Sequence, residues 1–462
     1  MTNLMLLANS AETTAPAVST GQLIAAALIG LVVLLVLIIG VKLHAMLSIL
    51  ISACLIGVLS GMDVSTIISS VNEGIGSTLK SIALLVGLGS MFGAVLEISG
   101  GAQRIAKTLV NVFGEKKAAW ALGITGLVIA MPVFFDAGLI ILIPLAMALA
   151  KGTKRSTLFY AIPLLAGLAV GHAFIPPTPG PILVASLLGV DLSYVIIVGI
   201  LCGIPAMILA GPVFGSFIGG KIDVPVPSNV AEMPEYDDSK LPGFGTVVGV
   251  IFIPLVLIIA KTICNVVAPE SAVMPLLTFL GEPFVALSIA TIAAMLVLGI
   301  KHGYSREELE KVMTKSLEPT GMILLVTACG GVLKYMLQSS GLGEVIGNAV
   351  SGLGLPMVVV AFVIAVLVRI SVGSATVAMT MAAGIVAAIP GISELSPLYL
   401  ACCTAAVAGG STVCSHFNDS GFWLVKSLLQ IDEKTTLKSW TVMETIVGAS
   451  GFVVALIISL FA

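Results

Sequence analysis

The chain has 462 residues, of which 58% are hydrophobic and only 10% are charged, and its formal net charge is −3. A soluble domain carries about 25% charged residues, so this composition excludes an ordinary soluble protein, and the slight acidic excess argues against a nucleic-acid partner. Apolar runs of roughly 20 residues, enough to cross a bilayer as a helix, recur along the whole length. The sequence therefore predicts an all-α polytopic membrane protein, with the lipid bilayer as its surroundings.

In chain order, we expect a polar tail and then two copies of one pattern. The tail covers residues 1–21, the copies cover 22–218 and 244–462, and a polar linker of residues 219–243 joins them. Each copy is predicted to contain three spanning helices, a helical hairpin, a broken spanning helix and a last span. The expected total is about ten spans and two hairpins.

The two copies are most alike at a glycine-containing segment in each. Residues 177–191 read PTPGPILVASLLGVD and residues 418–432 read NDSGFWLVKSLLQID, and seven of the fifteen positions are identical. Upstream, residues 128–150 align with residues 366–388. Paired, interrupted hydrophobic segments in the two halves of a transporter point to its binding site, so the sequence predicts that site at these breaks.

Lysine and arginine residues indicate that the copies are inverted. Four of them lie in 98–117 and three in 151–155, and the counterparts 338–354 and 389–396 contain none. In the other direction, four lie in 301–316 and three in 426–438, and the counterparts 61–77 and 185–191 contain none. Because lysine and arginine favour cytoplasmic loops, the copies must cross the membrane in opposite directions. The termini are then expected outside and the linker inside.

The same charges indicate re-entrant hairpins. Residues 118–150 are apolar and lie between two basic segments, both predicted to be cytoplasmic. A helix–turn–helix that enters partway, with its tip near 132–138, fits this length better than two full spans. Its counterpart, 355–388, enters from outside with a tip near 369–376. Irregular backbone at this depth is tolerated only beside protein or a watery cavity.

Four motifs at predicted breaks carry the polar chemistry. They are PVFFDAG (132–138), GHAFIPPTPGP (171–181), RISVGSATVAMT (369–380) and SHFNDSGFW (415–423). Ionisable residues inside a membrane are costly and are functional candidates by default. The candidates here are Asp136, His172, Arg369, His416 and Asp419.

Each residue type suggests a role. The planar guanidinium of Arg369 suits a carboxylate, the carboxyl groups of Asp136 and Asp419 can exchange protons, and His416 titrates near neutral pH. Backbone N–H groups at the breaks can bind an anion. Hydroxyl and amide groups that can hydrogen-bond a polyhydroxy substrate come from Thr178, Ser371, Ser374, Thr376, Ser415, Asn418 and Ser420. Together they favour a polyhydroxy carboxylate as substrate.

Structural alternatives stand beside these roles. Asp136 could cap the second hairpin helix, Arg369 could form a structural ion pair, and Asp419 with Asn418 could satisfy the broken backbone. His172 could be a satisfied buried histidine. Lys334 is interpreted as a side chain that extends to the membrane surface near a helix end. The seven cysteines show no metal-ligand spacing, so no metal or cofactor is expected.

Two other functions are compatible with parts of the sequence. Gly448-Ala449-Ser450-Gly451 matches a G-x-S-G pattern of intramembrane serine proteases, but it lies outside the four broken segments and no histidine occurs in a neighbouring unbroken span. A channel is the other alternative, although inverted repeats with two hairpins favour a gated carrier. The sequence thus predicts a transporter rather than an enzyme.

The motifs GGAQRIA (100–106), FIPPTPGP (174–181), RISVGSATVA (369–378) and SHFNDSGFWLVK (415–426) resemble the gluconate:proton symporter family, also called the gluconate permease (GntP) family. The resemblance covers the chain after the tail. It implies import of gluconate or a related aldonate with protons, while relatives transport idonate, fructuronate or D-serine. Members commonly have histidine where this chain has Thr178, and often glutamate where it has Asp136.

The resemblance completes the expectations. It implies a homodimer in the cell inner membrane and an elevator-like motion, with 118–218 and 355–462 as the transport part and 22–98 and 244–337 as the scaffold. A D-serine or other small hydroxy-acid symporter is the alternative. The predicted substrate-binding residues are Thr178, Gly180, Arg369, Ser371, Gly373, Ser374, Thr376, Ser415 and Asn418. Asp136, Asp419 and His416 are the predicted proton-coupling residues.

Overall fold

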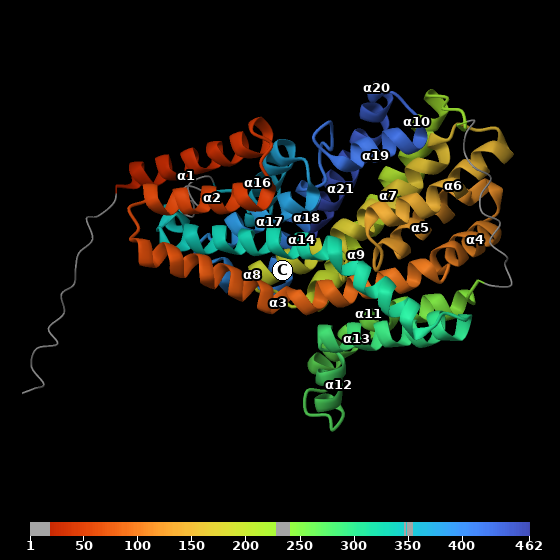
Figure 1. The fold of residues 1–462 in the computed structure, drawn as a ribbon, viewed down its shortest axis with the longest axis horizontal. Helices are drawn as coiled ribbons and strands as arrows, with labels where there is room; N and C mark the ends of the chain where they lie inside the picture. The colour runs from red at the N-terminus through yellow and green to blue at the C-terminus, as the bar shows by residue number, and fades with distance from the viewer. Residues whose placement is uncertain (1–18, 228–240, 346–347, 349–353) are drawn as a thin grey trace, which may run out of the picture.

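The computed structural model describes residues 19–227, 241–345, 348 and 354–462, and every regular element among them is a helix. Two long helices, α3 (Val64–Ile98) and α14 (Arg306–Ser339), pack side by side along the long axis of the molecule (Figure 1). Glycines make this contact possible: a Cβ on Gly74 would lie 2.5 Å from the backbone of Val332. Small residues let helix backbones approach closely within a membrane.

Among the residues that the structure describes, the first half of the chain supplies nine further helices. They are α1 (Thr20–Leu35), α2 (Ala45–Leu59), α4 (Gly101–Phe113), α5 (Ala118–Ala130), α6 (Phe135–Thr153), α7 (Leu158–Phe174), α8 (Pro179–Leu188), α9 (Leu192–Ile208) and α10 (Phe214–Lys221). A π-helical segment, Leu209–Val213, joins α9 to α10. Because Pro179 occupies the first turn of α8, where no backbone N–H is needed, it begins that helix without disrupting it.

The second half is built from a similar series. Its helices are α11 (Phe244–Val267), α12 (Met274–Leu280), α13 (Pro283–Ala293), α16 (Met357–Val372), α17 (Ala375–Ala387), α18 (Pro397–Gly410), α19 (Ser420–Leu429), α20 (Glu433–Thr436) and α21 (Val442–Ser459). A π-helical segment, Leu437–Thr441, joins α20 to α21. In Figure 1, α11, α12 and α13 lie along the lower edge of the molecule.

The two halves follow the same order of elements. A long helix, α3 or α14, precedes a helical hairpin, α5–α6 or α16–α17, and then a broken pair, α7–α8 or α18–α19. The helices end at or beside the predicted motifs: α5 stops at Ala130, just before the motif 132–138, and α6 starts inside it at Phe135, while α16 stops at Val372 and α17 starts at Ala375, both within 369–380. These bounds agree with the sequence alignment of the two halves.

Nine stretches of helix in the described residues are long and apolar enough to cross a membrane, against about ten predicted spans. Two predicted spans are shorter than expected, since α2 has 15 residues and α18 has 14. Conversely, the second hairpin arm α6 has 19 residues and reaches spanning length, because the helix continues past Pro144 to Thr153. The lengths therefore differ from the prediction more than the order does.

The predicted tail and linker lie partly outside the described residues. Ser19 caps α1 by accepting a hydrogen bond from the Gln22 backbone N–H, so the helix begins at Thr20, two residues before the predicted start of the first copy at residue 22. At the linker, α10 extends to Lys221 and α11 begins at Phe244, and residues 228–240 are not described.

The G-x-S-G segment has a structural explanation. A Cβ on Gly448 would lie 2.2 Å from the Gly409 carbonyl oxygen, and a Cβ on Gly451 would lie 2.4 Å from the ring of Phe174. Ser450 donates its hydroxyl proton to the Ile446 carbonyl within its own helix. The glycines thus allow α21 to pack closely on α18 and α7.

Candidate functional site

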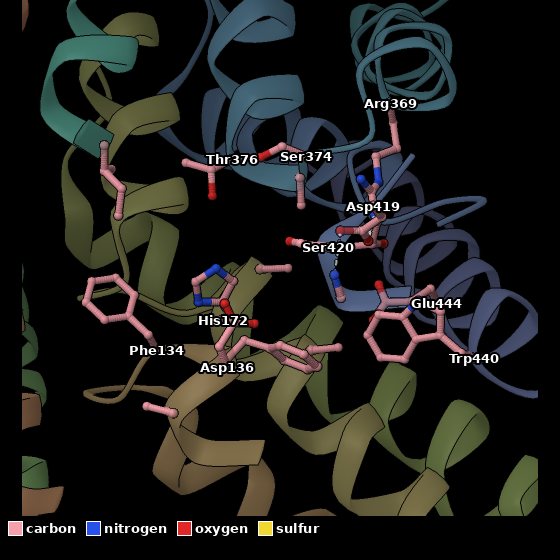
Figure 2. Close-up of a pocket in the computed structure, with 18 of the residues that line it drawn as sticks. Phe134, Asp136, His172, Arg369, Ser374, Thr376, Asp419, Ser420, Trp440 and Glu444 are labelled. Atoms are coloured by element: carbon pink, nitrogen blue, oxygen red, sulfur yellow. Dashed lines mark hydrogen bonds and ion pairs between the residues drawn. The ribbon is translucent and has the colours of Figure 1, made fainter. Parts of the chain in front are cut away.

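A cavity of about 430 Å³ lies where the two hairpin tips and the helix breaks meet (Figure 2). All four polar motifs contribute to its lining, together with Pro319 and Ile323 of α14 and Trp440 and Glu444 near and in α21. The polar and charged side chains that line it are Asp136, His172, Arg369, Ser374, Thr376, Thr412, Asp419, Ser420 and Glu444. Segments far apart in the sequence thus form one polar site.

Three helices begin at this cavity. Its lining includes the first residues of α6 (Phe135–Ala137), of α17 (Ala375 and Thr376) and of α19 (Ser420 and Gly421). A helix N-terminus presents unpaired backbone N–H groups and the equivalent of about half a positive charge. The cavity is therefore suited to anionic groups.

Arg369 and Asp419 form a buried ion pair at the edge of the cavity. The Nη2 atom of Arg369 lies 2.5 Å from Oδ2 of Asp419, and Figure 2 shows the two side chains pointing toward one another. The Arg369 side chain is 2% exposed, and its Nε and Nη1 atoms have no hydrogen-bond partner among the described residues. One face of the guanidinium is thus satisfied while two donors stay available.

Asp419 is held by several donors. It is the N-cap of α19 and accepts a 3.0 Å hydrogen bond from the Gly421 backbone N–H through Oδ1. Its Oδ2 atom also accepts from the Ser415 hydroxyl, which in turn accepts from Nε1 of Trp440 at 2.7 Å. Both structural alternatives considered for these residues, the ion pair and the helix cap, are therefore present.

Asp136 and His172 also face the cavity, but no hydrogen-bond donors like those around Asp419 hold them among the described residues. Asp136 lies in the first turn of α6 and is exposed, and α6 has no side-chain cap among the described residues, so Asp136 does not act as its N-cap. The Nδ1 atom of His172 is buried and has no partner among the described residues. Within the described part of the chain, neither side chain is held by a hydrogen bond that would explain its position structurally.

A third carboxylate, Glu444, also lines the cavity, although the sequence analysis did not select it. Glu444 is 5% exposed and lies one turn after Trp440. It was missed because the search for site residues followed the helix breaks, and Glu444 lies in an unbroken stretch of the last span. The signal was present, since Glu444 is the acidic residue within the apolar segment 441–461.

Comparison with known proteins identifies the family. The sequence model of the GntP family permease matches residues 22–461. The chain belongs to the GntP permease family. It is thus a multi-pass membrane transporter and not an enzyme, as its sequence predicted.

Relatives of the permease match over nearly their whole length. It is 38% identical to the low-affinity gluconate transporter of Escherichia coli K12 over 442 residues, which is 95% of this chain and 98% of the relative. It is 34% identical to the high-affinity gluconate transporter of the same organism, over 94% of this chain and 98% of the relative. It is 35% identical to the gluconate permease of Pseudomonas aeruginosa, over 94% and 97% of the two chains.

Two solved structures share the fold of the permease. The YdaH transporter of Alcanivorax borkumensis has a TM-score of 0.64 at 14% identity, covering 90% of this chain and 98% of that one. MtrF of Neisseria gonorrhoeae has a TM-score of 0.61 at 13% identity, covering 86% and 85% of the two chains. At these identities the likeness concerns the fold alone.

Some predicted site residues of the permease lie outside the cavity lining. Thr178 is 4% exposed and donates its hydroxyl proton to the Ile175 carbonyl at 2.8 Å, within the first helix break. Gly180 packs beside Met379, since a Cβ there would lie 2.5 Å from its sulfur. Both residues therefore shape the α7–α8 break and its contact with α17.

The second break contains a similar set. Asn418 donates from Nδ2 to the Ile370 carbonyl at 2.9 Å and also bonds to Nδ1 of His416. Gly373 has a φ of +85° and packs against Asn418 so closely that a Cβ would lie 2.2 Å from its carbonyl oxygen. Ser371 donates to the Leu367 carbonyl at 2.9 Å. The contacts of Asn418 with Ile370 and Gly373 join the second hairpin tip to the second break, whereas the Ser371 bond lies within α16.

The candidates His172 and Ser420 lie in the lining, and so do five of the predicted substrate-binding and proton-coupling residues. They are Asp136, Arg369, Ser374, Thr376 and Asp419. Ser415 lies behind Asp419 and is fully buried. Within the part of the chain that the structure describes, no group of three or more His, Cys, Asp or Glu side chains is arranged to hold a metal ion.

Proposed function

We propose that this permease imports gluconate or a closely related sugar acid across the cell inner membrane together with protons. The observation that carries the proposal is the cavity itself, which combines a buried arginine, helix N-termini, hydroxyl groups and three carboxyl groups. The names of the relatives, gluconate transporters from several bacteria, agree with this substrate.

The substrate carboxylate is assigned to the second hairpin tip. Arg369 keeps two donors without partners among the described residues, and Ser374, Ala375 and Thr376 bring the N-terminus of α17 to the same cavity. An arginine fork and a helix N-terminus are both favourable partners for a carboxylate. The Asp419 side chain orients the guanidinium from its other side.

The hydroxyl groups of the substrate are assigned to the polar lining. Thr376, Thr412 and Ser420 offer hydroxyl groups, and Trp440 and Phe135 offer apolar surface for the C–H groups of the sugar chain. Thr178, Gly180, Ser371, Gly373, Ser415 and Asn418 contribute indirectly, by shaping the breaks that carry these groups. A largely apolar cavity with a few precisely placed polar groups is typical of a small-molecule site.

Charge balance supports proton coupling. One arginine in the lining faces three carboxyl groups, those of Asp136, Asp419 and Glu444. Since Arg369 is already paired with Asp419, the arrival of an anionic substrate adds negative charge beside Asp136 and Glu444. In a poorly solvated site such like charges repel strongly, and proton uptake relieves the repulsion. Asp136 is proposed to take up this proton. Asp419 is instead proposed to hold Arg369 in place. His416 is paired with Asn418 away from the cavity, and no proton is assigned to it.

We further propose inverted repeats and an elevator-like motion in a homodimer. The transport part is 118–218 with 355–462, and the scaffold is 22–98 with 244–337. The inverted pattern of lysine and arginine and the repeated element order support this division. The cavity is compatible with it too, because α14 contributes Pro319 and Ile323 from the scaffold side while the rest of the lining comes from the transport part.

Uptake of labelled gluconate into proteoliposomes tests the proposal. With an acidic exterior and no sodium, we expect accumulation that a protonophore abolishes and that unlabelled gluconate inhibits more strongly than D-serine. Accumulation that requires sodium would contradict proton coupling. Stronger inhibition by D-serine than by gluconate would contradict the sugar-acid assignment.

A further inference from the structure

Glu444 differs from the other two carboxylates in its electrostatic support. Asp419 is paired with Arg369 and caps α19, and Asp136 lies in the first turn of α6, where a helix N-terminus favours negative charge. Glu444 lies inside the continuous helical stretch Glu433–Ser459, away from any helix end. Its carboxyl group makes no hydrogen bond or ion pair with a described residue.

The groups that face Glu444 across the cavity do not compensate its charge. They are Arg369, Asp419, Asp136 and His172. Arg369 and Asp419 are close enough to interact with Glu444 electrostatically, but they are bonded to each other. The helices α9 and α18 also pack on α21, and neither brings a charged side chain into the lining. The surroundings of Glu444 therefore contain no free cation among the described residues.

A carboxyl group in this position is best accommodated with its proton. Glu444 is 5% exposed, and burial of an unpaired charge is strongly unfavourable, whereas the neutral acid needs far less compensation. At the same time it lines a cavity that can admit water and substrate. This combination, a neutral buried acid with access to the substrate path, is what a proton carrier requires.

We infer that Glu444 carries a coupled proton, in addition to Asp136. The inference rests on the proposed sugar-acid symport and adds to it a second proton-carrying residue beside the substrate. A proton from water in the cavity binds a Glu444 carboxylate oxygen, which removes one negative charge before the substrate anion settles on Arg369. After the cavity opens to the other side and the anion leaves, the proton returns to water. Each transfer breaks one O–H bond and forms another, between hydronium and Glu444 on uptake and between Glu444 and water on release.

Two kinds of transport assay distinguish a proton-carrying role of Glu444 from a role in substrate binding. Exchange of labelled for unlabelled gluconate needs no net proton movement, while accumulation driven by a pH gradient does. For Glu444→Gln we expect exchange within about twofold of wild type and accumulation that is reduced but not abolished, because Asp136 still carries its proton. A pH difference of one unit supports about tenfold accumulation per coupled proton, so the loss is easily measured. Glu394→Gln, an exposed residue outside the cavity, is the matched control and should resemble wild type.

The outcomes distinguish this inference from the proposed function. Proton-driven accumulation by Glu444→Gln that equals wild type would overturn the inference and leave the symport intact. Loss of exchange in a folded variant would also overturn it, since Glu444 would then act in binding. Absence of gluconate transport by wild type would instead refute the proposed function.

A second variant covers the case in which Glu444→Gln does not fold. Glu444→Asp keeps the carboxyl group but shortens the side chain and so changes its surroundings. We expect coupled uptake with a shifted pH at half-maximal rate. An uptake rate with the same pH profile as wild type would contradict a proton-carrying Glu444, because a merely structural residue would leave that profile unchanged.

Discussion

Nη2 of Arg369 lies 2.5 Å from Oδ2 of Asp419, and this buried contact joins the end of α16 to the start of α19. The pair connects the second hairpin tip with the second helix break, two segments separated by 50 residues in the chain. Because Asp419 also accepts bonds from Gly421 and Ser415, it holds the guanidinium in one orientation. The spare donors of Arg369 are thereby fixed in place for a ligand.

Replacement of Arg369 tests the substrate assignment. Arg369→Gln removes the charge and the fork, and we expect gluconate affinity to fall by at least about thirtyfold, since truncation of a buried charge partner costs about 2 kcal/mol or more. Binding to the purified protein, measured by calorimetry, checks this. Wild-type affinity in the variant would contradict the assignment.

Arg369→Gln also leaves the buried Asp419 carboxylate without its ion-pair partner. The effect of the substitution on protein stability therefore needs a separate control. Breaking a buried ion pair by removing one partner costs about 3–5 kcal/mol. In the double variant Arg369→Gln with Asp419→Asn, we expect thermal stability to recover toward wild type while gluconate binding stays lost. Recovery of both would mean that Arg369 serves the fold and not the ligand.

Asp136 provides a test of coupling at the other hairpin. Asp136→Asn keeps the size of the side chain and its place in the first turn of α6 but removes the titratable group. We expect pH-driven accumulation of gluconate to fall by about tenfold per unit of pH difference, because Glu444 still carries its proton, while exchange of labelled for unlabelled gluconate continues. Glu394→Gln again serves as a control. Undiminished pH-driven accumulation by Asp136→Asn would remove this residue from the proton path.

The contact between α18 and α21 makes a prediction about stability. Since a Cβ on Gly448 would lie 2.2 Å from the Gly409 carbonyl oxygen, Gly448→Ala should destabilise the protein by about 1–3 kcal/mol. Gly321→Ala is the matched control, because a Cβ on Gly321 meets nothing within 4 Å and alanine favours a helix. Thermal unfolding in detergent compares the two. Equal unfolding temperatures would show that this close approach is absent in the protein.

Many aspects of the fold could be predicted because they depend on local chemistry. Proline, glycine and helix-capping residues mark the breaks near 132–138 and 415–423, and Arg369, Asp136 and Asp419 are conspicuous in apolar segments. The structure places all three charged residues at one cavity. Lengths were less predictable, as α6 shows by continuing through Pro144.

What could not be predicted depends on contacts between distant segments. Thr178 was expected to face the substrate, but its hydroxyl group satisfies the nearby Ile175 carbonyl, a choice that composition does not reveal. Lys334 is half-buried and donates to the Leu187 carbonyl near the C-terminus of α8, a contact between distant segments that the sequence does not indicate. Glu444 reaches the cavity only because α21 packs beside the second break, which no local pattern indicates.

The position of Lys334 leads to a prediction about motion. From α14, the Lys334 Nζ atom donates to the Leu187 carbonyl of α8 at 2.8 Å, and Gln338 donates to the Ala387 carbonyl of α17 at 3.1 Å. These bonds tie the proposed scaffold to the C-termini of two helices of the proposed transport part. A hydrogen bond from a charged donor contributes about 1.5–3 kcal/mol.

If the transport part slides along α14, this bond exists in one orientation of the cavity and not in the other. Lys334→Met should therefore change the rate of gluconate transport by roughly tenfold or more, with gluconate affinity changed far less than by Arg369→Gln. Lys301→Met, at an exposed position, is the control. A transport rate equal to wild type would indicate that the bond does not distinguish the two orientations.

The most direct test of gluconate:proton symport is a measurement of the two fluxes together. Proteoliposomes that contain a pH-sensitive dye and have no imposed gradient are mixed with gluconate, and internal pH and labelled gluconate are followed at once. We predict that the interior acidifies as gluconate enters, and that Arg369→Gln abolishes both signals. Gluconate entry without acidification would contradict the account.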